Sequence, residues 1–158
     1  MMIVIKGAGW VAAPVEDVWE VVRRVEELPS WLAGVRRADA RGPQGHGRVQ
    51  RTYGSRPGSR GGVDVEAEVI AYREPTLIAW RNVARRVGGG AWLPTRPDEL
   101  HLQLEPEQAR TMIRLYAVRQ VRLAGSLLLR LGGAWPVRDD LARSVAALDA
   151  RLNPRPAG

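Results

Sequence analysis

The chain has 158 residues, a length typical of a single domain that can build its own hydrophobic core. It carries 24 Lys+Arg against 17 Asp+Glu, a net charge of +7, and it has no cysteine, which excludes disulfides, thiolate metal sites and a cysteine nucleophile. A hydrophobic content of 45% excludes a disordered basic tail, and the arginines are scattered, so we interpret the charge as mostly solvated surface and codon bias and expect no DNA partner.

The apolar segments of the sequence are too short for targeting or membrane insertion. Residues 1–5 are apolar, but Lys6 follows at once, whereas a secretory signal has a longer apolar core after its charge. The longest later apolar stretch, residues 123–135, contains Arg130 and is well short of the ~20 residues that span a bilayer. We therefore expect no transmembrane segment and a cytoplasmic protein.

The N-terminal part predicts one strand followed by two short helices. Residues 1–10 are rich in β-branched side chains and alternate weakly, as a strand does. Pro14 suits the first turn of a helix. An apolar stripe at helical spacing then follows: Val15, Val18, Trp19, Val22 and Val25. Residues 30–34 predict the second helix, with Ser30 as its cap and Gly34 at its end.

The middle of the chain predicts six further antiparallel strands. Their ranges are 35–40, 48–54, 63–72, 76–82, 100–105 and 110–118. Residues 63–72 carry the clearest pattern, since apolar residues alternate with acidic ones and leave one face buried and one in water. The Gly- and Pro-rich segment 85–97, which carries Trp92, is expected to be a loop at the mouth of any cavity.

Two hairpin registers follow from period-two patterning. With Arg48 opposite Glu68, Arg51 lies opposite Val65 and Tyr53 opposite Val63, so both polar residues face the apolar side. The second register sets Glu105 opposite Arg110 and turns one set of residues inward: Leu100, Leu102, Leu104, Thr111, Ile113 and Leu115.

Trp80 is expected to face inward, although simple pairing of residues 76–82 with the preceding strand would turn it out. That pairing would bury Arg81 without a partner, which costs more than burying Trp80. A β-bulge near Ile70 or Tyr72 reverses the orientation and resolves the conflict.

The last third predicts a long C-terminal helix. Its apolar residues repeat at helical spacing: Val137, Leu141, Val145, Leu148 and Leu152. Pro136 and the Gly132-Gly133 pair are expected to kink or interrupt the segment from Val121 onward. Residues 153–158 are expected to form a flexible tail. The fold class is α+β: a curved seven-stranded antiparallel sheet wrapped around this helix, with two short helices after the first strand and an apolar space between sheet and helix.

Three segments resemble the START-like, polyketide cyclase/dehydrase (SRPBCC) superfamily, which includes the Bet v 1-like proteins. Residues 13–22 (APVEDVWEVV) resemble its opening helix, and residues 28–35 (LPSWLAGV) its second helix. Glu74-Pro75 followed by residues 78–81 (IAWR) resembles its fifth strand. The resemblance implies a helix-grip fold and a single START-like ligand-binding domain of residues 1–152. Members of the superfamily bind sterols, lipids, quinones, polyketides or plant hormones, and some catalyse cyclisation or dehydration.

Arg51 and Tyr53 are the main candidates for chemistry, because an inward guanidinium can bind a carboxylate or carbonyl group of a ligand. The alternative is that Arg51 lies near the rim, in water or paired with a carboxylate. The candidate pocket residues are Trp31, Arg51, Tyr53, Val65, Ala67, Trp80, Leu102, Ile113, Leu115, Leu128 and Trp135.

The sequence assigns no catalytic residue and predicts no cofactor and no metal site. His46 and His101 have no carboxylate at metal-ligand spacing, and Ser126 and Ser144 lack a nucleophile motif. Enzymatic activity is therefore open, with binding favoured.

Three functions remain. The first is a binding or carrier protein for a hydrophobic small molecule such as a lipid, polyketide or quinone. The second is a cyclase/dehydratase-type enzyme in which Arg51 or Tyr53 polarises a carbonyl. The third is a basic interaction protein that binds RNA, ribosome or acidic membrane. The sequence also leaves open whether the protein forms oligomers.

Overall fold

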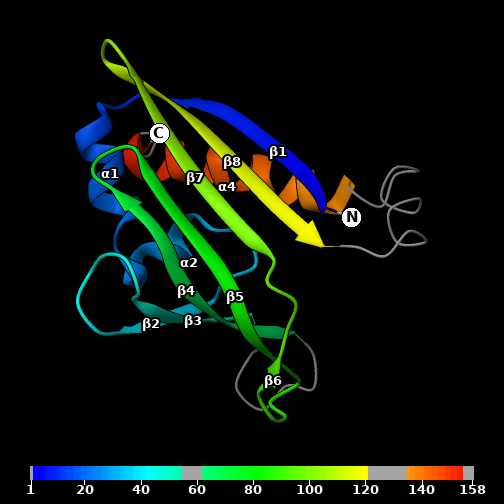
Figure 1. Ribbon diagram of the computed structural model, residues 1–158. Coiled ribbons are helices and arrows are strands. Elements are labelled where there is room, and N and C mark those ends of the chain that lie inside the picture. Colours follow the sequence, from blue (N-terminus) through cyan, green and yellow to red (C-terminus); the bar gives the residue numbers. More distant parts are fainter. Residues whose placement is uncertain (1, 55–61, 121–134, 155–158) are drawn as a thin grey trace.

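One antiparallel sheet and a C-terminal helix make up most of the molecule (Figure 1). The computed structural model describes residues 2–54, 62–120 and 135–154. The elements in chain order are β1 (Met2–Val11), α1 (Val15–Val22), the 3-10 turn η1 (Val25–Glu27), α2 (Leu28–Trp31), β2 (Arg37–Arg41), β3 (Val49–Tyr53), β4 (Val63–Arg73), β5 (Leu77–Val87), β6 (Leu93–Pro94), β7 (Glu99–Glu107), β8 (Arg110–Gln120) and α4 (Trp135–Leu152).

The helix-grip fold expected from the sequence is confirmed. The strands follow the order β1-β8-β7-β5-β4-β3-β2, and the two-residue β6 pairs with β5 outside that path. The segment expected as a loop at 85–97 is therefore partly strand, because β5 continues to Val87 and β6 pairs back onto Arg85 and Ala84. In the described part of the chain, no helix is long and apolar enough to span a bilayer.

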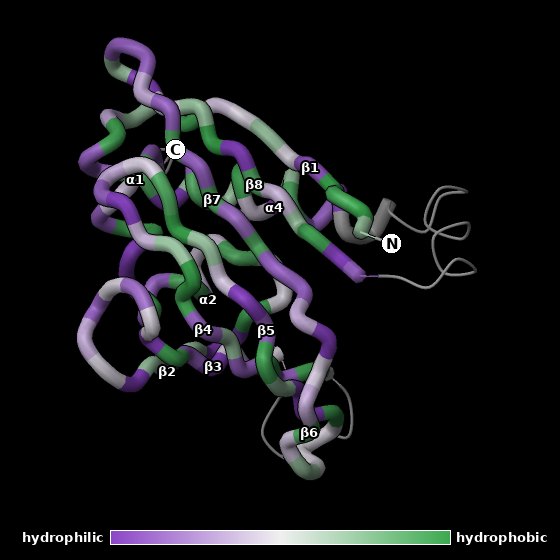
Figure 2. Tube along the Cα trace, viewed as in Figure 1, coloured by the Kyte–Doolittle hydropathy of each residue, from purple (hydrophilic) through white to green (hydrophobic). Residues whose placement is uncertain are grey.

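The core lies between the inner face of the sheet and the helices. Figure 2 shows strands on which hydrophobic and hydrophilic residues alternate, as expected for a sheet with one face buried. The inner face of the sheet contributes buried side chains that include Ile5, Ile78, Trp80, Leu102, Leu104, Ile113 and Leu115. The helices and η1 contribute Val15, Val18, Trp19, Val22, Val25, Leu28, Trp31, Leu141, Val145 and Leu148.

Two glycines of β1 let α4 approach the sheet at one edge. A Cβ atom added to Gly7 would lie 2.6 Å from Leu141 Cβ, and one added to Gly9 would lie 2.7 Å from Val145 Cγ1. Both distances are shorter than real carbon contacts, which lie near 3.5–4.0 Å. The glycines therefore bring α4 against β1, toward the edge of the sheet and away from β3 and β4.

The predicted register between β3 and β4 was wrong by one residue. Arg51 lies opposite Glu66, and Thr52 takes the expected place opposite Val65. A one-residue slip moves every side chain of a strand to the other face. Arg51 and Tyr53 therefore point to the outer face, and Gln50 and Thr52 point inward.

The predicted register between β7 and β8 was wrong by two residues, with a different consequence. Leu102 lies opposite Leu115 and Leu104 opposite Ile113. A shift of two residues keeps each side chain on its face. The inward orientation predicted for the β7 and β8 residues is therefore correct even though their partners differ.

The bulge that the sequence required near Ile70 is present. The β4–β5 register shifts between Val69 and Ala71, and Trp80 is buried on the inner face. Its Nε1 donates a hydrogen bond of 3.0 Å to Gln50 Oε1, and Gln50 is itself only 6% exposed. Arg81 lies on the outer face and forms an ion pair with Glu99 at 3.1 Å.

The helix boundaries differ from the sequence prediction at two prolines. The second helix spans Leu28–Trp31 instead of 30–34, because Pro29 lies in its first turn, where proline costs no hydrogen bond. Pro136 lies in the first turn of α4 for the same reason, so it does not kink the helix. The interruption expected from Val121 lies outside the described residues.

Candidate ligand cavity

A cavity of about 300 Å³ lies between the inner face of the sheet, the segment that follows α2 and the start of α4. Its lining residues come from elements far apart in the sequence: Leu32, Ala33, Gly34, Val35, Thr52, Gly54, Val63, Val65, Asn82, Asp98, Glu99, Leu100, Ala117, Arg119, Asp140, Leu141 and Ser144. The cavity exists on this side because α4 is held against β1.

Much of the cavity wall is apolar. Val65 of β4, Leu100 of β7 and Ala117 of β8 face it from the sheet, and Leu141 faces it from α4. Leu100 and Ala117 lie opposite each other in the register, so they form adjacent parts of one surface. An apolar concave wall with a few polar groups is the usual form of a small-molecule site.

One charged pair lies at the end of this wall. Arg119 Nη1 contacts Asp98 Oδ2 at 3.2 Å, and Asp98 Oδ1 also accepts a hydrogen bond of 3.2 Å from the backbone N–H of Gln120. The backbone of Asp98 is fixed in turn, because its carbonyl accepts a hydrogen bond of 2.8 Å from Asn82 N–H. Within the described part of the chain, Arg119 Nε is buried and has no hydrogen-bond partner, and the Arg119 side chain as a whole lines the cavity.

Ser144 has a structural role at the helix side of the cavity. Its hydroxyl donates to the carbonyl of Asp140 at 2.8 Å and accepts a hydrogen bond of 2.9 Å from Ala33 N–H. The hydroxyl thus connects α4 to the segment after α2. Among the described residues, these two hydrogen bonds of the hydroxyl are both to backbone groups.

The opposite end of the space between sheet and helices is filled by side chains. Trp19 of α1 packs against Tyr72 of β4, with ring centroids 5.2 Å apart. A void of about 20 Å³ lies there among the described residues, roughly the room for one water molecule.

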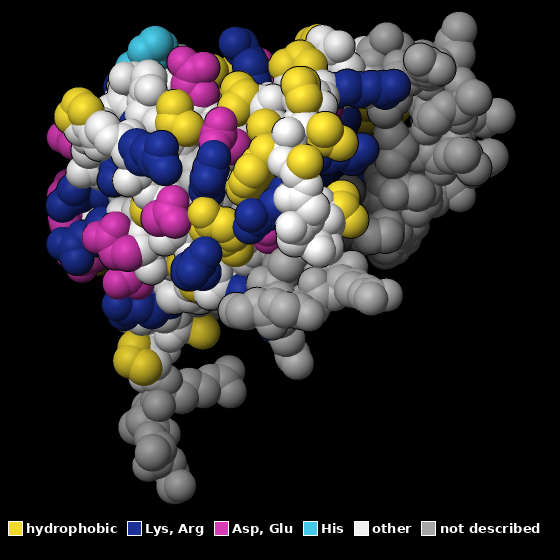
Figure 3. Space-filling model, turned by 90° about the horizontal axis from the view of Figure 1, so that it is seen from below, with side chains coloured by type: hydrophobic (Ala, Val, Ile, Leu, Met, Phe, Trp, Pro, Cys, Tyr) yellow, Lys and Arg dark blue, Asp and Glu magenta, His cyan; other side chains and the backbone are white. Residues whose placement is uncertain are grey.

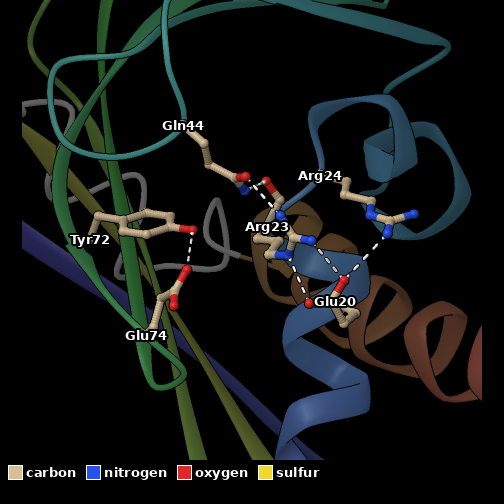
Figure 4. A network of polar contacts seen from close by, with 6 residues as sticks. All are labelled: Glu20, Arg23, Arg24, Gln44, Tyr72 and Glu74. Carbon is tan, nitrogen blue, oxygen red and sulfur yellow. Dashed lines mark hydrogen bonds and ion pairs between the residues drawn. The ribbon is translucent and has the colours of Figure 1, made fainter.

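A polar network holds that closed end together (Figure 4). Arg23 donates hydrogen bonds to Glu20 Oε1 and Oε2 at 3.0 and 2.7 Å and to Gln44 Oε1 at 2.7 Å. Gln44 Nε2 donates back to the carbonyl of Arg23 at 2.8 Å. The hydrogen bonds from Arg23 lower the pKa of Glu20. Burial raises the pKa of Tyr72, and so does the hydrogen bond that its hydroxyl donates to Glu74 at 3.1 Å.

The candidate pocket residues from the sequence divide into four groups, of which Arg51 and Tyr53 on the outer face are one. Val65 lines the cavity. A second group lies in the buried core and outside the cavity wall: Trp31, Ala67, Trp80, Leu102, Ile113 and Leu115. Leu128 and the side chain of Trp135 lie outside the described residues.

Arg51 and Tyr53 were placed on the wrong face, because the β3–β4 register differs by one residue. Arg51 Nε donates a hydrogen bond of 2.7 Å to Glu66, and its guanidinium lies 4.5 Å from the ring centroid of Trp92. The guanidinium of Arg37 lies 4.2 Å from the ring centroid of Tyr53. Arg51 therefore has the alternative arrangement, a pair with a carboxylate outside the cavity.

Sequence reasoning missed the polar residues of the cavity. Asp98 lies two residues before the inward-facing Leu100, and Arg119 lies two residues after the inward-facing Ala117. Extending the strand alternation by one step at the ends of β7 and β8 would have identified both residues. Thr52 could not be found in this way, because the register of β3 decides its face.

The side chains of potential metal ligands are scattered over residues 2–54, 62–120 and 135–154, and His101 does not line the cavity. The described residues contain no group of three or more His, Asp or Glu side chains that could hold a metal ion. His101 lies two residues from Glu99 on the outer face, with its Nε2 at 2.7 Å from Glu99 Oε2. Burial raises the pKa of Glu99, but hydrogen bonds from His101 and Arg81 outweigh it and leave that pKa below its ordinary value.

Comparison with solved structures supports the fold over nearly the whole chain. Norcoclaurine synthase from Thalictrum flavum, in a complex with dopamine and hydroxybenzaldehyde, is similar with a TM-score of 0.68 and 16% identity, over 100% of this chain and 90% of that one. A START superfamily protein from Mycobacterium smegmatis has a TM-score of 0.67 and 16% identity, over 94% and 96%. The major latex-like protein 151 of Panax ginseng has a TM-score of 0.67 and 11% identity, over 97% and 99%.

The sequence comparisons give the family. No curated protein matches the chain in sequence. The family model described as "Polyketide cyclase / dehydrase and lipid transport" matches residues 3–153, which is almost the entire chain. This match shows that the chain belongs to the polyketide cyclase/dehydrase and lipid transport family.

Proposed function

We propose that the protein binds a compact hydrophobic molecule in the cavity and acts as its carrier. The observation that carries this proposal is the partly apolar cavity of about 300 Å³ with one charged pair at its end. This volume falls at the lower end of the range of small-molecule sites, roughly 300–1,000 Å³. The family description, which includes lipid transport, supports the same reading.

The charges around the cavity favour a neutral polar group on the ligand. Asp98 already compensates Arg119, and Asp140 also lines the cavity. A free carboxylate would lie close to these two acidic groups and would be repelled. A carbonyl or hydroxyl oxygen can accept a hydrogen bond from the guanidinium of Arg119, which lines the cavity, without that repulsion. We therefore expect quinone- or polyketide-like ligands to bind better than fatty acids.

A second candidate function is cyclisation or dehydration of a polyketide-like substrate, which the family description also names. In that case Arg119 would polarise a substrate carbonyl, and Asp98 would be the nearest carboxylate able to take up a proton. Replacing Arg119 by Met should then abolish turnover of a polyketide mimic while the cavity still binds it. Absence of turnover by the wild-type protein leaves binding as the function.

Ligand titration with matched variants tests the binding proposal. Calorimetry would compare menadione, a neutral naphthoquinone, with 2-naphthoate, an anion of similar size. Val65→Trp places an indole in the cavity and should abolish binding, whereas Val4→Trp, an exposed site on the outer face of β1, should leave it unchanged. Native mass spectrometry of the purified protein would identify any ligand retained from the cell. Equal binding of menadione by Val65→Trp and wild type would refute the proposed site.

A further inference from the structure

The sheet has an exposed apolar patch where β4, β5 and β6 meet. Val63, Val87 and Leu93 are 47%, 59% and 61% exposed, and we call these three residues the rim patch. Val63 lies opposite Val87, and Arg85 lies opposite both Val65 and Leu93. Opposed residues share a face of the sheet. Because Val63 and Val65 line the cavity, the rim patch continues the cavity wall to the surface.

Arginines without carboxylate partners accompany the rim patch. Arg85 lies opposite Leu93 and two residues before Val87, so it neighbours the rim patch on the sheet. It forms no ion pair in the part of the chain that the structure describes. Arg36, next to the cavity residue Val35, and Arg96, two residues before Asp98, are also exposed and have no ion pair there. Figure 3, which looks at the molecule from the β6 end, shows hydrophobic side chains interspersed with Lys and Arg and with some Asp and Glu.

We propose that the rim patch and its arginines dock the protein on an anionic phospholipid bilayer, with the cavity mouth facing the lipid. This inference rests on the proposed carrier function, because a hydrophobic ligand partitions into bilayers and must enter the cavity from there. Apolar side chains can enter the boundary between headgroups and acyl chains while arginines contact phosphate groups. Each basic residue near such a surface strengthens binding about fivefold.

The size of the rim patch favours a bilayer over a protein partner. Stable protein interfaces involve roughly 20–30 residues on each side, whereas this patch consists of three large apolar residues and the flanking arginines. A bilayer needs no complementary shape, so a small amphipathic patch is sufficient for weak, reversible binding.

Vesicle co-sedimentation of the full chain tests the inference. Vesicles of phosphatidylcholine with phosphatidylglycerol should bind the wild-type protein, and binding should weaken as salt rises. Leu93→Glu should weaken binding about tenfold or more, through lost apolar insertion and added repulsion. Arg85→Ala should weaken it about fivefold. Val4→Glu is the matched control, since Val4 is also 47% exposed but lies on the outer face of β1, and it should bind as wild type does.

The outcomes separate docking from ligand binding. Absence of wild-type binding to the anionic vesicles at low salt, or an equal loss in Leu93→Glu and Val4→Glu, would overturn the docking inference. Binding to a mixed-sequence RNA but not to vesicles would overturn it in favour of a nucleic-acid partner. The menadione titration is done without vesicles, so its failure beside intact docking would count against the carrier function alone.

Discussion

The contact between α4 and β1 predicts that alanine at position 7 destabilises the protein. The new Cβ atom of Gly7→Ala would lie 2.6 Å from Leu141 Cβ. This distance is about 1 Å shorter than an optimal carbon contact. Because Leu141 Cβ is bonded to the helix backbone, no rotamer change relieves the contact, and α4 must move away from the sheet.

The expected change in the free energy of unfolding of Gly7→Ala follows from two opposing effects. Overpacking of this kind costs about 1–3 kcal/mol. Alanine is itself about 0.5–1 kcal/mol better than glycine in a strand. We therefore expect the free energy of unfolding to fall by about 1–2 kcal/mol in Gly7→Ala. Gly9→Ala should cost less, because its nearest neighbour is Val145 Cγ1, a side-chain methyl group that can rotate away.

Urea unfolding followed by tryptophan fluorescence measures these differences. Ala8→Val is the control, since Ala8 is exposed on the same strand, and its effect should stay within about 0.5 kcal/mol. A second-site change separates the two positions: Val145→Ala removes the methyl group that Gly9→Ala would meet, while Leu141→Ala keeps the Cβ that Gly7→Ala would meet. Wild-type stability in Gly7→Ala, or rescue of Gly7→Ala by Leu141→Ala, would refute the reasoning.

Three further predictions concern polar residues. Gln50→Leu should lower the free energy of unfolding by about 1–3 kcal/mol, because it leaves the buried Nε1 of Trp80 without an acceptor, and urea unfolding would measure it. Arg51→Met should leave menadione affinity unchanged in calorimetry, because Arg51 lies on the outer face; a large loss would contradict the β3 register. The pKa of Glu99 in the folded protein is lower than its ordinary value of 4.5. The ionised carboxylate therefore contributes stability that is present above pH 4.5 and is lost as the pH falls from 4.5 through the pKa of the folded protein. Glu99→Gln should therefore reduce the acid-induced loss of stability in thermal melts, and an unchanged pH profile would disprove this role for its contacts with His101 and Arg81.

The sequence alone determined the architecture and most of the inner face of the sheet. Alternation in residues 63–72 and 100–118 identified the buried side chains of β4, β7 and β8, since strand periodicity is a local property. The cost of burying Arg81 was enough to predict the bulge at Ile70 and the inward Trp80.

The local sequence pattern did not predict the geometry of the turns between strands, and this caused the errors in register. The β7–β8 turn is tighter than expected, because Glu107 pairs with Arg110. Gln108 in this turn has a positive φ of 55°, a conformation that a glutamine in the sequence does not predict. The resulting shift of two residues preserved the faces. In β3 the predicted register was wrong by one residue. Arg51 therefore lies on the outer face and Thr52 on the inner face, the reverse of the prediction.

Only the tertiary structure decided where the cavity lies and which charges it contains. The position of α4 depends on the absence of two Cβ atoms in β1, at residues more than 130 positions away from Leu141 and Val145. The Asp98–Arg119 pair joins the ends of two strands through their register. Both features arise from distances between segments remote in sequence, whereas periodicity reports only which side of its own strand a residue occupies.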